Sequence, residues 1–318
     1  MNRYVEAARP RTLPAAVTPV VVGTAAAMRP VSDLYIDRAV LALAVALSLQ
    51  IAVNYANDLF DGLSGVDTAE RTGPRRAVAS GLISPAEMKR ATALVLAVAG
   101  VAGLILAWQV GWELLLVGAL AILATLGYSG GSKPYASRGL GELSVFVFFG
   151  VVATAGSAYV QDGVLTLVPL LASLPVGFLA VALLVVNNLR DIPTDEVAGK
   201  RTLAVRLGEP ATRRLYQALV GLALVGVVVI ALVVDGWWPL LGLVATPLAV
   251  MPLRQAGRVP LGPGLVPVLE ATGRVQLLLG VGLAVGLGLT PLAGVGVLLG
   301  APDVLPAIGS AATATGAG

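Results

Sequence analysis

The most constraining feature of this chain is a series of apolar stretches, each close to the length that crosses a lipid bilayer. A spanning helix needs about 20 predominantly apolar residues. Runs of roughly this kind occupy residues 12–28, 39–57, 91–109, 113–128, 143–160, 164–188, 215–234, 237–253 and 275–299. Lipid cannot satisfy backbone polar groups, and no run shows the alternation of a barrel strand, so these runs should be helices. We therefore expect an all-α polytopic membrane protein with nine transmembrane helices, forming one domain over residues 1–300. The small-residue tail at 301–318 is expected to be disordered.

Composition agrees with this class and limits the available chemistry. Hydrophobic residues make up 57% of the 318 positions and charged residues 12%, unlike a soluble globular domain. The chain has no cysteine and no histidine, which excludes disulfides, thiol nucleophiles, imidazole bases and the usual zinc sites. We expect a lipid bilayer and small molecules as partners, and no nucleic acid. Any chemistry must use carboxylates, Lys, Arg, hydroxyls and added metal.

The distribution of basic residues predicts the orientation. If the N-terminus is cytoplasmic, all but Arg29 and Arg38 of the 21 Lys and Arg residues lie on the inner side. The four tryptophans then form a belt at the outer interface. We expect the plasma membrane as the location. A cleaved signal peptide is an alternative for the first run, since Ala25 to Ala27 resembles a cleavage site, but nine spans account for the charge pattern.

A first acidic cluster, NYANDLFDGLSGVD at residues 54–67, lies where the second apolar run meets the inner side. Asn54, Asp58 and Asp61 are spaced i, i+4, i+7, and Asn57 precedes Asp61 by four, so these side chains share or adjoin a helical face. A charge at bilayer depth costs about 2.5–3.5 kcal/mol on insertion scales, so it usually faces a protein cavity. One such cluster by itself is equally consistent with a helix end in the headgroup layer.

A second cluster, NNLRDIPTDEVAGKR at residues 187–201, follows the sixth apolar run on the same side. Asn187, Asp191 and Asp195 are spaced i, i+4, i+8. Pro193 is expected to kink or end that helix, which makes the direction of Asp195 less certain. Two such clusters on one side of the membrane indicate a shared site.

Facing carboxylates need a cation between them, and hard oxygen ligands suit Mg²⁺, which commonly bridges carboxylates to phosphate oxygens. Basic residues surround the acids, although the positive-inside pattern alone would also place them there; they include Arg71, Arg75, Arg76, Lys133, Lys200 and Arg201. Carboxylate, magnesium, diphosphate and cationic side chains form a complete arrangement for a diphosphate leaving group. With an apolar bundle behind it to hold an isoprenoid chain, the expected reaction is prenyl transfer. Phe60, Tyr128 and Tyr135 are candidates to face the allylic cation or simply to pack.

These residues resemble a known family. NDLFDGLSGVD and RDIPTDEVAGKRT resemble the two aspartate-rich motifs of the UbiA-type intramembrane prenyltransferases, and YSGGSKPY at 128–135 resembles their tyrosine and lysine segment. ARPRTLPA at the start, RTGPRRAVASGLISP at 71–85 and the spacing of Asp67 after Asp61 resemble the 1,4-dihydroxy-2-naphthoate branch.

The resemblance implies a nine-helix UbiA-like bundle with a Mg²⁺-dependent, cytoplasm-facing site. Together with the cluster geometry it gives three sets of expected site residues. Metal ligands are expected at Asn57, Asp58, Asp61, Asp67, Asp191 and Asp195. Catalytic roles are expected for Asp61, Asp191 and Lys133. Substrate binding is expected at Asn54, Asn57, Arg71, Tyr128, Asn187, Lys200 and Arg201, with Arg9 or Arg11 meeting the acceptor carboxylate.

For the reaction, the resemblance implies transfer of a polyprenyl group from polyprenyl diphosphate to 1,4-dihydroxy-2-naphthoate, with loss of CO₂ and diphosphate, as in menaquinone biosynthesis. Loss of CO₂ would restore the aromatic ring without a base, which suits a chain lacking histidine. Other acceptors remain open, including 4-hydroxybenzoate, homogentisate and a lipid glycerol phosphate. A cation-coupled transporter is the alternative from another class, but transporters usually place such acids near the bilayer midplane.

Overall fold

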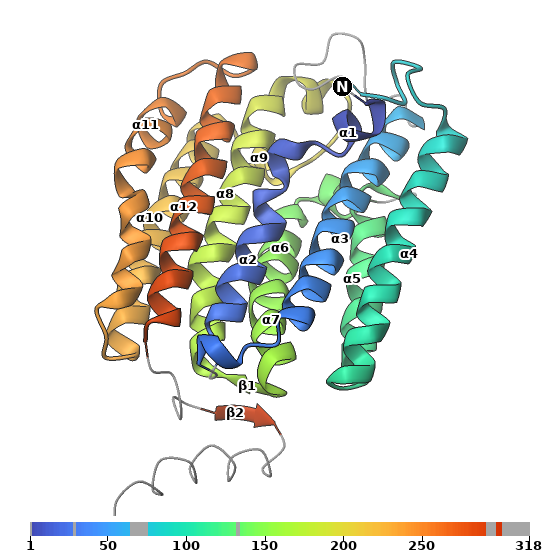
Figure 1. The fold of residues 1–318 in the computed structure, drawn as a ribbon. Helices are drawn as coiled ribbons and strands as arrows, with labels where there is room; N and C mark the ends of the chain where they lie inside the picture. The colour runs from blue at the N-terminus through green and yellow to red at the C-terminus, as the bar shows by residue number, and fades with distance from the viewer. Residues whose placement is uncertain (1, 28–29, 64–75, 132–133, 291–296, 301–318) are drawn as a thin grey trace, which may run out of the picture.

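The structure is a computed structural model that describes residues 2–27, 30–63, 76–131, 134–290 and 297–300. Its first half contains α1 (Arg3–Ala7), η1 (Pro10–Thr12), α2 (Pro14–Ala25), η2 (Val31–Asp33), α3 (Ile36–Leu63), α4 (Pro85–Gln109), α5 (Glu113–Ser129), η3 (Ala136–Arg138), α6 (Gly141–Val145), η4 (Phe146–Val152) and α7 (Ala153–Asp162). Its second half contains β1 (Val164–Thr166), α8 (Leu167–Val197), α9 (Leu203–Leu207), α10 (Glu209–Val233), η5 (Trp238–Ala245), α11 (Thr246–Ala256), η6 (Pro263–Leu265), α12 (Val266–Gly288) and β2 (Val297–Gly300). The long helices run side by side, with α1 and α9 at one end and the two strands at the other (Figure 1).

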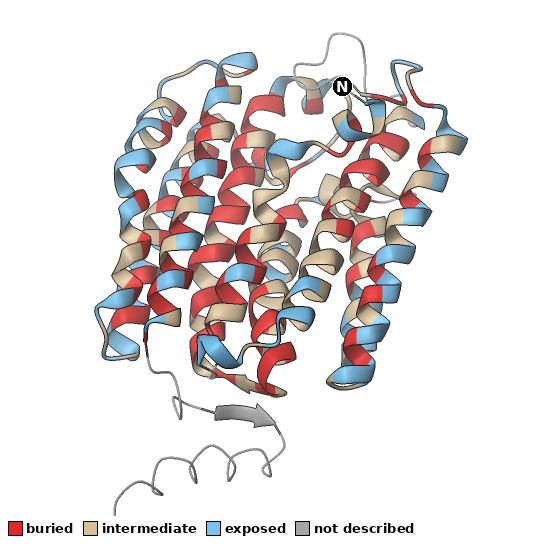
Figure 2. Ribbon diagram, viewed as in Figure 1, coloured by how far each residue is buried: buried red, intermediate tan, exposed pale blue. Residues whose placement is uncertain are grey.

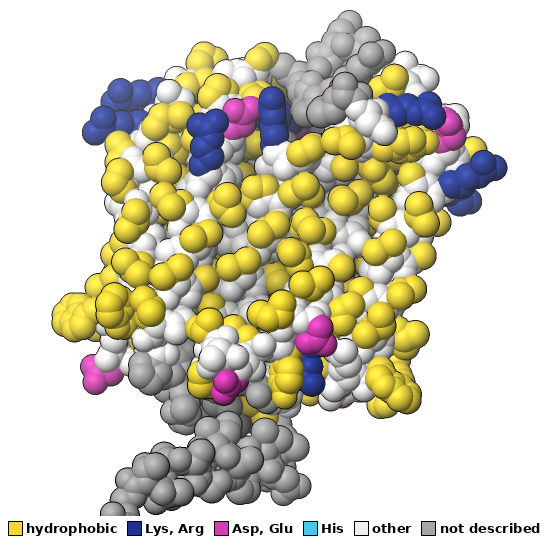
Figure 3. All heavy atoms as spheres, in the orientation of Figure 1, with side chains coloured by type: hydrophobic (Ala, Val, Ile, Leu, Met, Phe, Trp, Pro, Cys, Tyr) yellow, Lys and Arg dark blue, Asp and Glu magenta, His cyan; other side chains and the backbone are white. Residues whose placement is uncertain are grey.

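The expected helical membrane architecture is confirmed. Among the described residues, six helical stretches are long and apolar enough to cross a bilayer: Ile36–Leu63, Pro85–Gln109, Gly141–Asp162, Leu167–Val197, Glu209–Val233 and Pro263–Gly288. The apolar helices α2 and α5 are shorter. Hydrophobic side chains cover the middle of the visible face, and Lys and Arg gather mainly at the end that holds the N-terminus (Figure 3). The count of nine spans stays a prediction.

The last predicted span is displaced relative to the structure. It was expected at 275–299, but α12 begins at Val266 and ends at Gly288. Glu270 and Arg274 lower the hydropathy of its first turns, which hides them from an apolar scan. Farther along, β2 pairs antiparallel with β1, so the described residues include a short two-stranded sheet as well as helices.

Of the two expected effects of Pro193, a kink or a helix end, the helix end does not occur, because α8 continues to Val197. The turn around the proline keeps other hydrogen bonds: Thr194 Oγ1 donates to the Asp191 carbonyl oxygen over 3.0 Å, and the Ala198 N–H donates to the Thr194 carbonyl oxygen over 3.0 Å. Asp191 and Asp195 therefore lie on one continuous helix.

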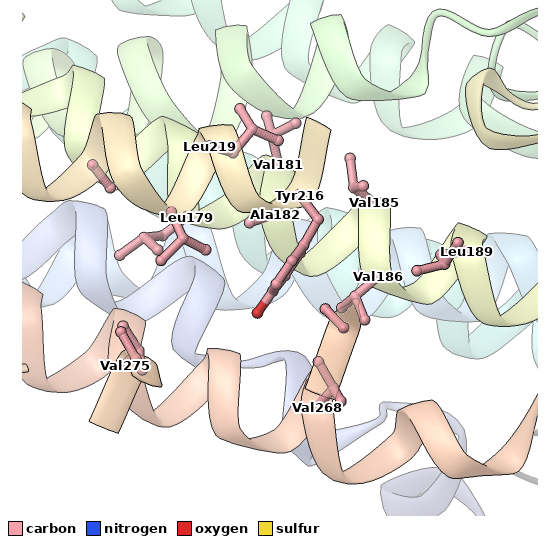
Figure 4. Close-up of a cluster of buried hydrophobic side chains, with 14 of the residues drawn as sticks. Leu179, Val181, Ala182, Val185, Val186, Leu189, Tyr216, Leu219, Val268 and Val275 are labelled. Atoms are coloured by element: carbon pink, nitrogen blue, oxygen red, sulfur yellow. The ribbon is translucent and has the colours of Figure 1, made fainter. Parts of the chain in front are cut away.

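Helix α8 is the most buried long helix and packs against α10 and α12 (Figure 2). Tyr216 of α10 is fully buried between them, and its hydroxyl lies 2.6 Å from Thr272 Oγ1 of α12 (Figure 4). On another side, a Cβ on Gly150 of η4 would lie 2.7 Å from the Gly177 Cα of α8, so these two backbones can approach closely only because both residues are glycine. This packing fixes the helix that carries the second acidic cluster.

Candidate active site

A cavity of about 520 Å³ lies between α3, α5, η4, α7 and α8, with α2 and α4 adding to its wall. Along α3 its lining extends from Ala42 to Asp61, which at 1.5 Å per residue is about 28 Å. That length is close to the roughly 30 Å of a bilayer hydrocarbon core. The Asp61 end is polar and the remainder is lined mainly by apolar side chains.

Both acidic clusters meet at the polar end of this cavity. Asn57 and Asp61 of α3 line it together with Asn187, Asp191 and Asp195 of α8. Lys200, just beyond α8, joins the two clusters directly, because its Nζ lies 2.9 Å from Asp61 Oδ2. Residues more than 120 positions apart in the sequence thus share one chamber.

Each central aspartate is paired with positive charge. Asp61 also lies 3.4 Å from Arg76 Nη2. The Asp191 carboxylate accepts two hydrogen bonds of 2.7 Å from Arg190, which are donated by Nε and Nη2. Arg190 Nη2 also donates to Asn187 Oδ1 over 2.9 Å. These pairs are largely buried, so each acid must either keep a cation nearby or exchange it for another.

Part of the wall at this end is made by the end of α5 and by described residues that follow it, among them Tyr135. Ser129 Oγ donates to Asn57 Oδ1 over 2.6 Å, which fixes the amide of Asn57. The Tyr128 ring lines the cavity and packs edge-on against Tyr135, with centroids 5.5 Å apart. The Tyr135 hydroxyl donates to the Ala124 carbonyl oxygen over 2.7 Å, and burial raises the pKa of Tyr135, so this phenol stays neutral.

Asp58 and Asn54 of the first cluster have hydrogen-bond partners that indicate a structural role. Asp58 is buried, and its two carboxylate oxygens accept the backbone N–H groups of Ala77 and Val78 at 3.0 and 2.8 Å. Its side chain is not among the described residues that line the cavity. Asn54 does line it, but its Nδ2 donates to the Ala8 carbonyl oxygen over 2.8 Å and to Thr12 Oγ1 over 3.0 Å. Asn54 therefore holds the N-terminal segment against α3.

The remaining basic candidates within the described residues are Arg9, Arg11 and Arg201, and they differ in whether they line the cavity. Arg9 lines the cavity and has a left-handed backbone, with φ 52°. Arg11 instead pairs with Glu270 at 2.6 Å, and 65% of its side chain is exposed. Arg201 is exposed and, like Arg11, is absent from the described cavity lining.

The sequence profile of the UbiA prenyltransferase family matches residues 16–260. The chain belongs to this family. The 1,4-dihydroxy-2-naphthoate octaprenyltransferase of Mycobacterium tuberculosis is 49% identical over 278 residues, which cover 86% of this chain and 93% of that protein. The protein of the same name from Escherichia coli is 40% identical, over 86% of this chain and 91% of that protein.

Solved UbiA structures share the fold. A UbiA homolog from Archaeoglobus fulgidus bound to GPP and Mg²⁺ superimposes with a TM-score of 0.61 at 16% identity, covering 87% of this chain and 99% of that one. The apo UbiA homolog from Aeropyrum pernix K1 gives a TM-score of 0.65 at 17% identity, over 86% and 95% of the two chains. At these identities the likeness concerns the fold alone.

For a UbiA protein, the donor set at the polar end is chemically suited to Mg²⁺. Asn57, Asp61, Asp191 and Asp195 offer hard amide and carboxylate oxygens to one chamber. In the described ranges, no group of three or more acidic side chains is already arranged as a metal cage. Mg²⁺ usually binds through one or two carboxylates, several waters and substrate phosphates. The cations now beside Asp61 show that this carboxylate attracts positive charge.

Three predicted site residues, Asp67, Arg71 and Lys133, lie outside the described residues. The structure adds polar residues that the sequence did not single out. Asn188 lines the cavity and donates to Glu142 Oε1 of α6 over 3.0 Å, and Glu142 is buried. Two sequence signals could have found these residues. Glu142 is an acid at the edge of an apolar run, and Asn188 is the second residue of an Asn pair. Ser129 was part of a quoted motif, but its contact with Asn57 depends on how α3 packs against α5.

Proposed function

We propose that this UbiA protein transfers a polyprenyl group from polyprenyl diphosphate to 1,4-dihydroxy-2-naphthoate, releasing diphosphate and CO₂ and forming demethylmenaquinol. The observation that carries the proposal is one cavity with two parts. Its polar end gathers the acids and cations of both motifs, and its long remainder is apolar. A substrate with a diphosphate head and an isoprenoid tail fits both parts. The naphthoate acceptor is supported by the names of relatives that are 40–49% identical over most of the chain.

The donor head would lie between the ends of α3 and α8. Asn57, Asp61, Asp191 and Asp195 would hold Mg²⁺, which supplies charge neutralisation of the departing diphosphate. Lys200 and Arg76, now paired with Asp61, are within reach of phosphate oxygens placed beside that acid. Asp67, Arg71 and Lys133 belong to the same proposed site by their motif positions.

The acceptor would lie beside Arg9. Arg9 is held in its left-handed conformation by a short network: Asn54 and Gln50 both donate to Thr12 Oγ1, which itself donates to the Arg9 carbonyl oxygen over 2.9 Å. A non-glycine residue in this backbone region costs on the order of 1–3 kcal/mol, and such strain is concentrated at functional sites. Since Arg11 is engaged by Glu270, Arg9 is the better candidate to meet the acceptor carboxylate.

The reaction balances without a base acting on the ring. A bond forms between the carboxylate-bearing ring carbon and C1 of the prenyl group, while the C–O bond to diphosphate breaks and its electron pair leaves with diphosphate. The C–CO₂⁻ bond then breaks, and its electron pair restores the aromatic ring as CO₂ departs. The Tyr128 ring lines the cavity near the polar end and is available to face the allylic cation.

We further propose that the polar end faces the cytoplasm in the plasma membrane, with residues 1–300 acting as one domain. The support is the gathering of Lys and Arg at the end that holds the N-terminus (Figure 3) and the positive-inside rule.

The test is an acceptor panel with reconstituted protein, Mg²⁺ and labelled octaprenyl diphosphate. The acceptors are carboxyl-¹³C 1,4-dihydroxy-2-naphthoate, 4-hydroxybenzoate, homogentisate and a glycerol phosphate lipid. We expect prenylation of the naphthoate alone, with one labelled CO₂ released per prenylated product. Prenylation of another acceptor in preference to the naphthoate, or a naphthoate product that keeps its label, would contradict the proposal.

A further inference from the structure

Glu142 is a buried acid beside the cavity that the proposed reaction does not use. It lies in the first turn of α6, at the start of the helical stretch Gly141–Asp162, and only 7% of it is exposed. A helix N-terminus stabilises a carboxylate there, because its free backbone N–H groups carry partial positive charge. Burying an acid is costly unless it also has a hydrogen-bond partner, so the partner of Glu142 is informative.

That partner is Asn188 of α8. Asn188 Nδ2 donates to Glu142 Oε1 over 3.0 Å. A carboxylate can only accept hydrogen bonds, so it turns the NH₂ group of the amide toward itself and the amide oxygen away. In the described part of the chain, this is the only side-chain hydrogen bond of Asn188. Its Oδ1 is therefore oriented and has no donor.

The open side of Asn188 Oδ1 is the cavity. Asn188 lines the cavity, whereas Glu142 is absent from the described lining, and Oδ1 is not among the atoms sealed inside the protein without a partner. The preceding residue differs, because Asn187 Oδ1 already accepts a hydrogen bond from Arg190. Asn188 thus offers a fixed hydrogen-bond acceptor to a molecule in the chamber.

This oxygen lies next to the place where the two substrates would react. Asn188 precedes Asp191 by three residues, which places it about 4.5 Å along α8 from the proposed metal site, toward the apolar part of the cavity. At the start of α6, a Cβ on Gly141 would lie 3.3 Å from the Tyr128 hydroxyl oxygen, so the pair is near the ring that is available to the allylic cation. An amide oxygen repels diphosphate but accepts from a hydroxyl.

We infer that Asn188 Oδ1 accepts a hydrogen bond from the 4-hydroxyl of the naphthoate acceptor, and that Glu142 is the positioning residue that orients this oxygen. The inference rests on the proposed function and adds recognition of a hydroxyl to it. The 1-hydroxyl is adjacent to the carboxylate and can donate to it within the molecule. The 4-hydroxyl is too far from the carboxylate to do so and needs a partner from the protein. An analogue without this hydroxyl leaves Oδ1 unpaired and is therefore disfavoured.

The experiment compares KM for 1,4-dihydroxy-2-naphthoate with the inhibition constant of 1-hydroxy-2-naphthoate, which lacks only the 4-hydroxyl. Asn188→Leu should raise KM for the dihydroxy acceptor by about 3- to 10-fold, the contribution of one neutral hydrogen bond. The inhibition constant of the analogue and KM for octaprenyl diphosphate should be nearly unchanged. Asn188→Ala provides the same comparison if the leucine variant does not fold. Turnover at saturating acceptor shows that a variant is folded.

The positioning role of Glu142 is tested in the same assay. Glu142→Gln keeps the size of the side chain, but its amide can donate as well as accept, so it no longer fixes the direction of Asn188. It should produce part of the rise in KM for the dihydroxy acceptor, and it should add nothing in the Asn188→Leu background. Thr125→Val is the matched control, because Thr125 also lines the cavity but its hydroxyl already donates to the Ala121 carbonyl oxygen. This variant should change neither constant.

Three outcomes would overturn parts of this account. An unchanged KM in the Asn188 variant, or equal losses for substrate and analogue, would overturn the inference while leaving the proposed function intact. A Glu142→Gln effect that persists in the Asn188→Leu background would overturn the positioning role of Glu142. Wild-type protein that does not prenylate the naphthoate would overturn the proposed function, and this inference with it.

Discussion

Lys200 Nζ lies 2.9 Å from Asp61 Oδ2, so a residue just beyond α8 neutralises the acid at the end of α3. Only 16% of the Lys200 side chain is exposed, so water and salt screen this pair less than they screen a surface ion pair. The contact ties the two motifs together before any substrate binds, and it places an ammonium group where the donor diphosphate would lie.

Replacing Lys200 by Gln should weaken donor binding. Hydrogen bonds to charged groups contribute about 1.5–3 kcal/mol, so KM for the prenyl diphosphate should rise roughly tenfold or more. Arg201→Gln is the matched control, because Arg201 is adjacent, basic, exposed and absent from the described cavity lining. Equal effects of the two substitutions would show that only net positive charge matters.

Asn54→Ala should raise KM for the acceptor while leaving KM for the donor nearly unchanged. The substitution removes the two hydrogen bonds that hold Ala8 and Thr12, and with them the turn that orients Arg9. Arg9→Gln should have the same acceptor-specific effect, and Arg11→Gln should have little. Steady-state kinetics with each substrate varied in turn provides the measurement. A donor-specific effect of Asn54→Ala would argue against an acceptor site beside Arg9.

Asp58→Asn should lower the melting temperature of the purified protein. The carboxylate now accepts hydrogen bonds from two backbone N–H groups, whereas the Asn amide would offer an oxygen to one of them and an NH₂ group to the other. The lost hydrogen bond should lower the free energy of unfolding by about 1.5–3 kcal/mol. A variant with wild-type melting temperature and an altered Mg²⁺ requirement would instead identify Asp58 as a metal ligand.

Removing divalent metal with EDTA should abolish turnover, and Mg²⁺ should restore it. The two central acids of the site carry protein cations in this structure, and diphosphate would add negative charge to the same chamber. Full activity without divalent metal would mean that Lys and Arg alone neutralise the leaving group.

The helical character of the fold was predictable from sequence because apolar length is a local signal. The meeting of the two motifs was predictable because both acidic clusters follow apolar runs on the same predicted side of the membrane. The start of α12 was not, since Glu270 and Arg274 interrupt the apolar pattern although the helix continues through them. The continuation of α8 past Pro193 was also missed, because side-chain and last-turn hydrogen bonds compensate for the proline only in the folded helix.

Within the site, spacing placed Asn54, Asp58 and Asp61 together but could not assign their partners. Asp58 accepts a hydrogen bond from the backbone of Ala77, 19 residues later in the chain. Asn54 donates one to the backbone of Ala8, more than 40 residues earlier. Arg9 and Arg11 are equivalent in the sequence, and tertiary contacts separate them: Arg9 lines the cavity, whereas Arg11 pairs with Glu270, which is distant in the chain. These distinctions depend on tertiary contacts that local spacing does not encode.

The most direct test of the account is prenyl transfer by Asp61→Asn and Asp191→Asn, measured under saturating Mg²⁺ and both substrates in reconstituted membranes. We predict that each variant remains folded and loses turnover by about 10²-fold or more, the scale on which loss of one electrostatic stabiliser reduces enzymatic rates. Near-wild-type turnover in both variants would contradict the claim that the ends of α3 and α8 form one diphosphate site.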